Sequence, residues 1–85
     1  MPSKTVAVGS AIGLHARPAA LIAQAATELG VPVTLSTNGE EPVDAGSALM
    51  IMTLGAGHGD QVTVESEDEA ALARITELVA ADLDA

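Results

Sequence analysis

The stretch "GLHARPAA", residues 13–20, places a histidine two positions before an arginine and three before a proline. These residue types are scarce, because the whole chain has 2 histidines and 3 basic side chains. A neutral imidazole nitrogen is a nucleophile that can attack phosphorus, and a guanidinium binds phosphoryl oxygens through its fork of N–H groups. These residues are compatible with phosphoryl transfer, but a histidine that only caps a helix or lies in a loop is the more common case for a lone histidine beside one arginine, and geometry alone does not decide between the two.

An alanine-rich apolar run follows Pro18 and predicts the helix that positions this pair. Its apolar residues recur at helical spacing, and Gly30 followed by Pro32 is a strong stop signal. The predicted buried face of this helix consists of Leu21, Ile22, Ala25, Ala26 and Leu29.

A helix that begins near Ala16 places His15 at its N-cap. The N–H groups of a first turn have no acceptor inside the helix, and Pro18 loses no helical hydrogen bond there because it has no N–H. A phosphoryl group on His15 would meet the amides of Ala16 and Arg17, the Arg17 guanidinium and the positive end of the helix dipole. These are the surroundings that a bound phosphate prefers.

Segments of alternating hydrophobicity predict the strands. Lys4–Val8 and residues 31–36 and 60–66 alternate in the manner of half-buried strands. Asn38–Gly39 is a tight-turn signal before a short strand around Pro42–Val43, and the proline favours an edge position for that strand.

Two further helices are predicted in the second half of the chain. Ser47 is an N-cap candidate for a short helix in "ALMIMT". Ser66 and Glu69 form a capping box that opens a last helix. The apolar stripe of that helix consists of Leu72, Ile75, Leu78, Val79 and Leu83.

The resulting order is strand, helix, strand, strand, short helix, strand, helix. This order predicts an α+β fold of the open-faced β-sandwich type, in which two long helices and one short helix cover one face of a four-stranded, mainly antiparallel sheet. A length of 85 residues fits a single domain over residues 1–85.

Composition excludes several functional classes. With 12 acidic and 3 basic residues the net charge is -9, which has the wrong sign for a nucleic-acid partner. The chain has no cysteine for a disulfide or a thiolate zinc site, and His58 in "AGHG" lacks a ligand-like spacing to His15, so no metal site is expected. No apolar run approaches the roughly 20 residues of a membrane span, and the N-terminus lacks the apolar segment of a signal peptide. We therefore expect a cytoplasmic protein without membrane insertion.

"GLHARPAA" resembles the active-site segment of HPr, the histidine-containing phosphocarrier family of the bacterial sugar phosphotransferase system (PTS). A second stretch, "SALMIMTLGAGHGD", is similar to the short-helix and loop region of that family, and the resemblance covers essentially the whole chain. It implies that His15 accepts phosphate on Nδ1 from phosphorylated enzyme I, which is charged by phosphoenolpyruvate. His15 would then pass the phosphate to a histidine of a sugar-specific enzyme IIA, and Arg17 would neutralise the phosphoryl oxygens.

The same resemblance implies a stoichiometric carrier, which is not an enzyme in the turnover sense, needs no cofactor and is expected to be a monomer. Ser47 matches the position that a dedicated kinase phosphorylates in HPr of many low-GC Gram-positive bacteria. Between His15 and Ser47 this chain has one residue more than the commonest family spacing, in the "NGEEP" turn. A pure N-cap role is the alternative for Ser47.

The run Leu49, Met50, Ile51, Met52 is too apolar to be buried entirely on one short helix, so part of it is expected at the surface. By resemblance, Leu49 and Met52 belong to the patch that docks enzyme I and enzyme IIA, and a loosely packed core is the alternative. Many family members have lysines where this chain has Gln24 and Thr27, so either the affinity for its partners or the charge of those partners is expected to differ.

Three other functions are compatible with the sequence. A specialised paralogue, such as a nitrogen-related HPr, would use the same chemistry in a mainly regulatory role. A small-ligand-binding module of α+β type would use no phosphoryl chemistry. A metal-binding protein that uses His15, His58 and carboxylates is the least favoured alternative.

Overall fold

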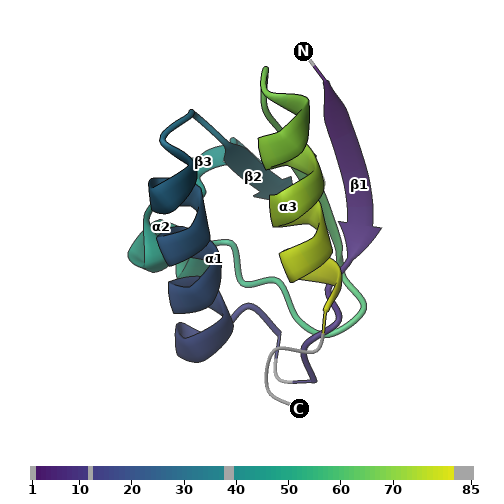
Figure 1. The fold of residues 1–85 in the computed structure, drawn as a ribbon. Coiled ribbons are helices and arrows are strands. Elements are labelled where there is room, and N and C mark those ends of the chain that lie inside the picture. The colour runs from purple at the N-terminus through teal and green to yellow at the C-terminus, as the bar shows by residue number, and fades with distance from the viewer. Residues whose placement is uncertain (1, 12, 38–39, 82–85) are drawn as a thin grey trace.

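A computed structural model describes residues 2–11, 13–37 and 40–81 of the chain. The elements follow in the order β1 (Ser3–Ala7), α1 (Ala16–Leu29), β2 (Thr34–Thr37), β3 (Val43–Asp44), α2 (Ala48–Thr53), β4 (Gln61–Glu65) and α3 (Glu69–Ala80) (Figure 1). This is the predicted order of elements. Within the described ranges no helix is long and apolar enough to cross a membrane.

The four strands form one sheet in the order β1-β4-β2-β3, and all three strand pairings of the described chain are antiparallel. The three helices cover one face, with α1 packed against both α2 and α3 (Figure 1). Strand β3 lies at an edge, as predicted, and Pro42 directly precedes it. The α+β open-faced sandwich is therefore confirmed.

The alternation of apolar and polar residues along the strands gives the sheet one buried face and one face toward solvent. Val62 and Val64 of β4 and Leu35 of β2 are fully buried beneath the helices. On the opposite face the hydroxyls of Thr5 and Thr63, which are cross-strand partners, share a hydrogen bond of 2.9 Å. Hydroxyl side chains of this kind suit a sheet face that remains in contact with water.

The hydrophobic core cluster is built from aliphatic side chains, because the sequence has no aromatic residue. Its largest fully buried members are Ile22, Leu35, Ile51 and Ile75, which come from α1, β2, α2 and α3 respectively. One side chain from each of these elements therefore ties the three helices to the sheet, mainly through the burial of apolar surface.

The predicted buried face of α1 is partly wrong. Leu21 and Leu29 are 41% and 37% exposed, whereas the buried positions are Pro18, Ala19, Ile22, Ala23 and Ala26. Compared with the predicted face, the buried face of α1 thus contains more small residues. Small side chains at a helix contact allow the helix to pack closely against its neighbours α2 and α3. The two leucines consequently lie on the flank of the buried stripe.

The predicted capping box of α3 is also wrong. The N-cap is Asp68, whose Oδ1 accepts a hydrogen bond of 3.0 Å from the amide of Ala71. Ser66 is buried instead, and its hydroxyl donates to the carbonyl of Pro32 at 3.0 Å. This long-range bond joins the end of β4 to the chain before β2, a tertiary contact that local sequence does not reveal.

The remaining predictions about α3 agree with the structure where it can be compared. Leu72, Ile75 and Val79 are buried and Leu78 is half-buried. The predicted turn at Asn38–Gly39 and the predicted stripe position Leu83 lie outside the described residues.

Candidate functional site

His15 lies at the N-cap of α1, as predicted. Its backbone is extended, with φ -81° and ψ -171°, and its carbonyl accepts the hydrogen bond of the Ala19 amide at 2.9 Å. Its side chain is exposed and makes no capping hydrogen bond. The backbone of His15 therefore starts the helix while the imidazole ring points to solvent, where a reaction partner can reach it.

The first turn of α1 offers an environment for an anion. Ala16 and Arg17 are exposed, and no acidic residue lies in this turn. Within residues 2–11, 13–37 and 40–81 the amides of Ala16 and Arg17 have no hydrogen-bond acceptor. Pro18 is buried and anchors the turn to the core. Two unpaired amides and one guanidinium thus lie within a turn of His15, at the positive end of the helix.

The segment that leads into His15 is fixed by a distant loop. The amide of Leu14 donates to the carbonyl of Ala56 at 2.9 Å, and the Leu14 side chain is buried. Gly13 has φ +80°, and a Cβ there would lie 2.5 Å from the Ala56 oxygen and 2.8 Å from the Gly57 Cα. Only glycine permits this approach, so the start of α1 is held at a defined place against the loop after α2.

Replacement of Gly13 with alanine is expected to lower the free energy of unfolding by about 3 kcal/mol or more, the sum of a left-handed backbone and a steric clash. Gly30→Ala is the matched control, because Gly30 has φ +70° but nothing within 4 Å of an added Cβ. It is expected to cost only about 1–2 kcal/mol. Urea unfolding followed by far-ultraviolet circular dichroism measures both, and equal losses would contradict the close contact.

A hollow of about 230 Å³ opens beside His15, lined by Leu14, His15, Met52, Gly55, Ala56 and Gly57. Two of its lining residues are glycines, so no side chain from those positions obstructs approach to the imidazole. The sequence alone does not single out Gly13, Gly55 or Gly57 as site residues. The glycine directly before "LHARP" and the run "GAGHG" were the available signals.

Helix α2 presents an apolar surface next to this hollow. Leu49, Met50 and Met52 are 70%, 42% and 36% exposed, whereas Ile51 between them is fully buried. We refer to Leu49, Met50 and Met52 as the α2 face. The prediction that part of this run lies at the surface is confirmed, and the alternative of a loosely packed core is wrong for Leu49 and Met52. Their role in docking stays a prediction.

Ser47 is the N-cap of α2, as predicted. Its Oγ accepts a hydrogen bond of 3.3 Å from the amide of Met50, and the residue is half-buried. The hydroxyl therefore has a structural role in the unmodified protein. Phosphorylation of Ser47 by a dedicated kinase stays a prediction.

Ser47→Ala is expected to lower the free energy of unfolding by about 1 kcal/mol, because the Met50 amide loses its acceptor. Ser47→Asp supplies a replacement acceptor and is expected to retain most of the stability. Urea midpoints of the two variants measured beside the parent protein test this. Equal losses in both would show that the cap contributes little.

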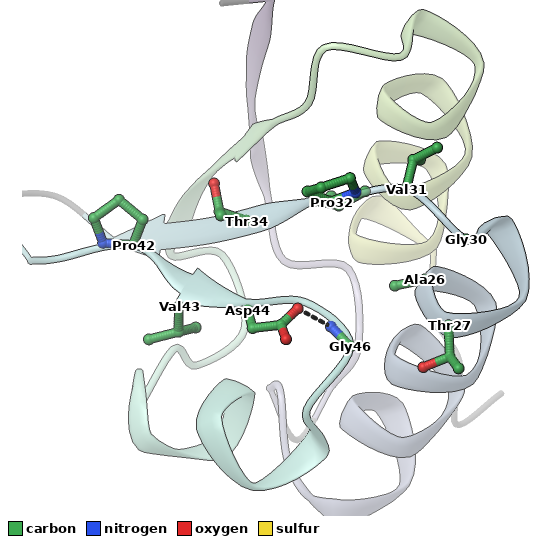
Figure 2. A pocket seen from close by; sticks show the side chains of 11 residues that line it. Ala26, Thr27, Gly30, Val31, Pro32, Thr34, Pro42, Val43, Asp44 and Gly46 are labelled. Atoms are coloured by element: carbon green, nitrogen blue, oxygen red, sulfur yellow. Dashed lines mark hydrogen bonds between the residues drawn. The ribbon is translucent and has the colours of Figure 1, made fainter.

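A larger hollow, of about 450 Å³, lies away from His15 between the end of α1, residues 31–34 and strand β3. Figure 2 shows its lining, including Asp44, whose Oδ1 accepts a hydrogen bond of 2.8 Å from the Gly46 amide. Neither His15 nor Arg17 borders it. A small-ligand-binding module would use such a hollow, but its lining has no histidine and no cationic side chain for phosphoryl chemistry.

His58 is exposed in the loop between α2 and β4. Among the described residues no group of three or more histidine, cysteine, aspartate or glutamate side chains is placed to hold a metal ion. The structure thus does not bring His15, His58 and a carboxylate together as ligands.

Comparison with known proteins shows which family the chain resembles. The sequence matches the family model described as PTS HPr component phosphorylation site over residues 2–81. It is 45% identical over 87 residues to phosphocarrier protein HPr of Streptomyces coelicolor, a match that covers 99% of this chain and 94% of that protein.

Solved structures show the same likeness. The crystal structure of phosphocarrier protein HPr from Bacillus anthracis has a TM-score of 0.82 at 34% identity, with 92% of this chain and 95% of that chain covered. An HPr structure from Thermoanaerobacter tengcongensis has a TM-score of 0.77 at 30% identity, with 94% and 96% covered. Because the sequence match spans nearly the whole chain and the folds agree, the protein belongs to the HPr family of phosphocarrier proteins.

Proposed function

We propose that this protein is a phosphoryl carrier of the PTS, which accepts a phosphoryl group on Nδ1 of His15 from phospho-enzyme I and donates it to a histidine of a sugar-specific enzyme IIA. The observation that carries the proposal is the exposed imidazole at the N-cap of α1 in a chain of the HPr family. It makes no capping hydrogen bond and adjoins Arg17 and two unpaired amides.

The proposed transfer needs no group beyond the two proteins. A lone pair of the neutral His15 ring attacks phosphorus in line, the new N–P bond forms, and the bond to the donor nitrogen breaks with its electron pair returning to the donor. The second transfer repeats this step with His15 as the leaving group. Arg17 and the amides of Ala16 and Arg17 bind the phosphoryl oxygens in both directions.

An exposed helix end suits a relay better than a deep pocket does. A carrier must bind the phosphoryl group well enough to keep it between encounters and loosely enough to release it. Donor and acceptor must each approach His15 closely, which the hollow of about 230 Å³ between His15, Met52 and Gly55 permits. We place this relay in the cytoplasm, with the carrier as a monomer that needs no cofactor.

The test is intact-mass spectrometry at neutral to alkaline pH after incubation with phosphoenolpyruvate and enzyme I from the same organism. The proposal expects a gain of one acid-labile phosphoryl group, which then disappears when enzyme IIA is added. A folded protein that gains no phosphate from this enzyme I would contradict the proposal and favour the small-ligand-binding module.

A further inference from the structure

The loop between α2 and β4 forms one wall of the hollow beside His15, through Gly55, Ala56 and Gly57. Residues 54–59 read "LGAGHG", so every second position of this loop is a glycine. Glycine loses more conformational freedom on ordering than any other residue. The loop therefore needs specific contacts to keep one position beside the imidazole.

The side chain of Asp60 supplies such a contact. Its Oδ2 accepts a hydrogen bond of 2.8 Å from the amide of Gly57, and its own amide donates to the Gly57 carbonyl at 3.0 Å. The turn that these two bonds close is joined to the end of β1. The Asp60 carbonyl accepts from the amide of Val8 at 2.9 Å, and the Gly59 amide donates to the carbonyl of Val8 at 3.0 Å. Because Val8 is buried, the Asp60 carboxylate connects Gly57 to a fixed part of the fold.

The backbone of Gly57 in turn lies against the segment that ends at His15. A Cβ on Gly13 would lie only 2.8 Å from the Gly57 Cα, so the two backbones approach each other closely. The neighbouring carbonyl, that of Ala56, accepts the hydrogen bond of the Leu14 amide. Since Gly13 and Leu14 directly precede His15, the position of the imidazole depends on where this loop is held.

We propose that Asp60 is a positioning residue for phosphoryl transfer, which acts by holding Gly57 and, through it, the backbone of His15. This inference rests on the proposed function and adds a residue to the same site. Asp60 does not line the hollow beside His15. It lines a separate hollow of about 340 Å³, which shares only Gly55 and Ala56 with the first, so its influence on the imidazole passes through the backbone. In-line transfer requires the reacting atoms to be about 3–3.5 Å apart and aligned, so a displaced loop slows the transfer step itself.

The deciding experiment is single-turnover transfer from phospho-enzyme I to the carrier, measured over a range of carrier concentrations. Asp60→Ala removes the acceptor of the Gly57 amide. It is expected to lower the maximal rate about tenfold, with the half-saturating concentration within about twofold of the parent value. Asp60→Asn keeps an oxygen that accepts the same bond and is expected to restore most of the rate, which separates the hydrogen bond from the charge. Asp60→Glu, which displaces the carboxylate by one methylene, is the test if the alanine variant does not fold.

Asp44→Ala is the matched control. Asp44 is also exposed, and its Oδ1 accepts a bond of the same length, 2.8 Å, from the amide of Gly46. The substitution therefore removes the same charge and the same kind of turn bond. Neither Asp44 nor Gly46 lines the hollow beside His15, so the maximal rate is expected to stay at the parent value.

Hydrogen exchange of the Leu14 amide, followed by NMR in the carrier alone, reports the loop position without any partner. Because this amide donates to Ala56, Asp60→Ala is expected to accelerate its exchange about tenfold, whereas Asp44→Ala leaves it unchanged.

Three results would overturn the role of Asp60 and leave the carrier function intact. They are equal maximal rates in Asp60→Ala and Asp44→Ala, a rise of the half-saturating concentration alone, and an Asp60→Asn variant as slow as Asp60→Ala. The second result would make Asp60 a docking contact, and the third would assign its effect to charge. A folded parent protein that gains no phosphate at all would overturn the carrier function and this role of Asp60 together.

Discussion

His15→Ala is expected to abolish phosphorylation by phospho-enzyme I completely, whereas Ser47→Ala and His58→Ala each still gain one acid-labile phosphoryl group. The reason is chemical, because His15 has a nucleophilic ring nitrogen and directly precedes two residues with unpaired amides, of which Arg17 also carries a guanidinium. Ser47 is engaged in the α2 cap, and His58 is exposed on a different loop. Intact-mass spectrometry at neutral to alkaline pH distinguishes these outcomes, since the N–P bond does not survive acid.

The loss of phosphorylation in His15→Ala identifies the acceptor only if the variant is still folded. The imidazole makes no capping hydrogen bond, so its removal is expected to leave the far-ultraviolet circular dichroism spectrum unchanged. His15→Asn provides a second variant, because asparagine is a favourable N-cap residue that has no nucleophilic ring nitrogen. Full phosphorylation of either folded variant would move the acceptor to another residue and refute the assignment of His15.

Local signals in the sequence were sufficient to predict the element order and the place of His15. Pro18 near the start of α1 and Gly30 at its end mark a helix whose termini depend on residues within a few positions. Ser47 likewise caps α2 through a bond to Met50, three residues away. Such features arise from backbone groups that a helix end leaves unpaired, and they can therefore be predicted without tertiary structure.

Tertiary contacts account for what the sequence did not reveal. Ser66 satisfies the usual capping pattern but is drawn into the core by its bond to Pro32, which leaves Asp68 as the cap. The hydrophobicity of Leu21 predicts an inward position, yet smaller neighbours form the contact face of α1. Periodicity alone does not fix how far a helix is rotated about its axis against its neighbours.

The candidate site was likewise predictable only in part. His15, Ala16 and Arg17 are adjacent in sequence, so their proximity follows from the helix start alone. The contact of Gly13 with Ala56 and the approach of Met52 to His15 each join segments more than thirty-five residues apart. These two contacts determine how the imidazole is held and what a partner meets beside it, and both depend on the complete fold.

Arg17→Ala is expected to slow phosphoryl transfer to and from His15 by roughly 10- to 100-fold, with most of the loss in kcat. Arg17 lies in the first turn of α1, two residues after His15, and its exposed side chain can fold toward a phosphoryl group there. A group that stabilises negative charge mainly in the transition state affects both directions of transfer. Single-turnover transfer from phospho-enzyme I, and from the phosphorylated carrier to enzyme IIA, measures the two rates separately.

Two further variants, Arg17→Lys and Arg74→Ala, show whether the Arg17 contribution to the transfer rates depends on its charge, its planar guanidinium or its position. Lysine keeps the charge but loses the planar fork, so Arg17→Lys is expected to recover only part of the rate. Arg74→Ala removes the same charge from an exposed position on α3 and is expected to leave both rates unchanged. If Arg17→Ala behaved like Arg74→Ala, the helix amides alone would suffice to bind the phosphoryl oxygens. If only transfer to His15 slowed, the transfer from His15 to enzyme IIA would not need Arg17. Arg17 would then act in docking enzyme I and would not stabilise the transition states of both transfers.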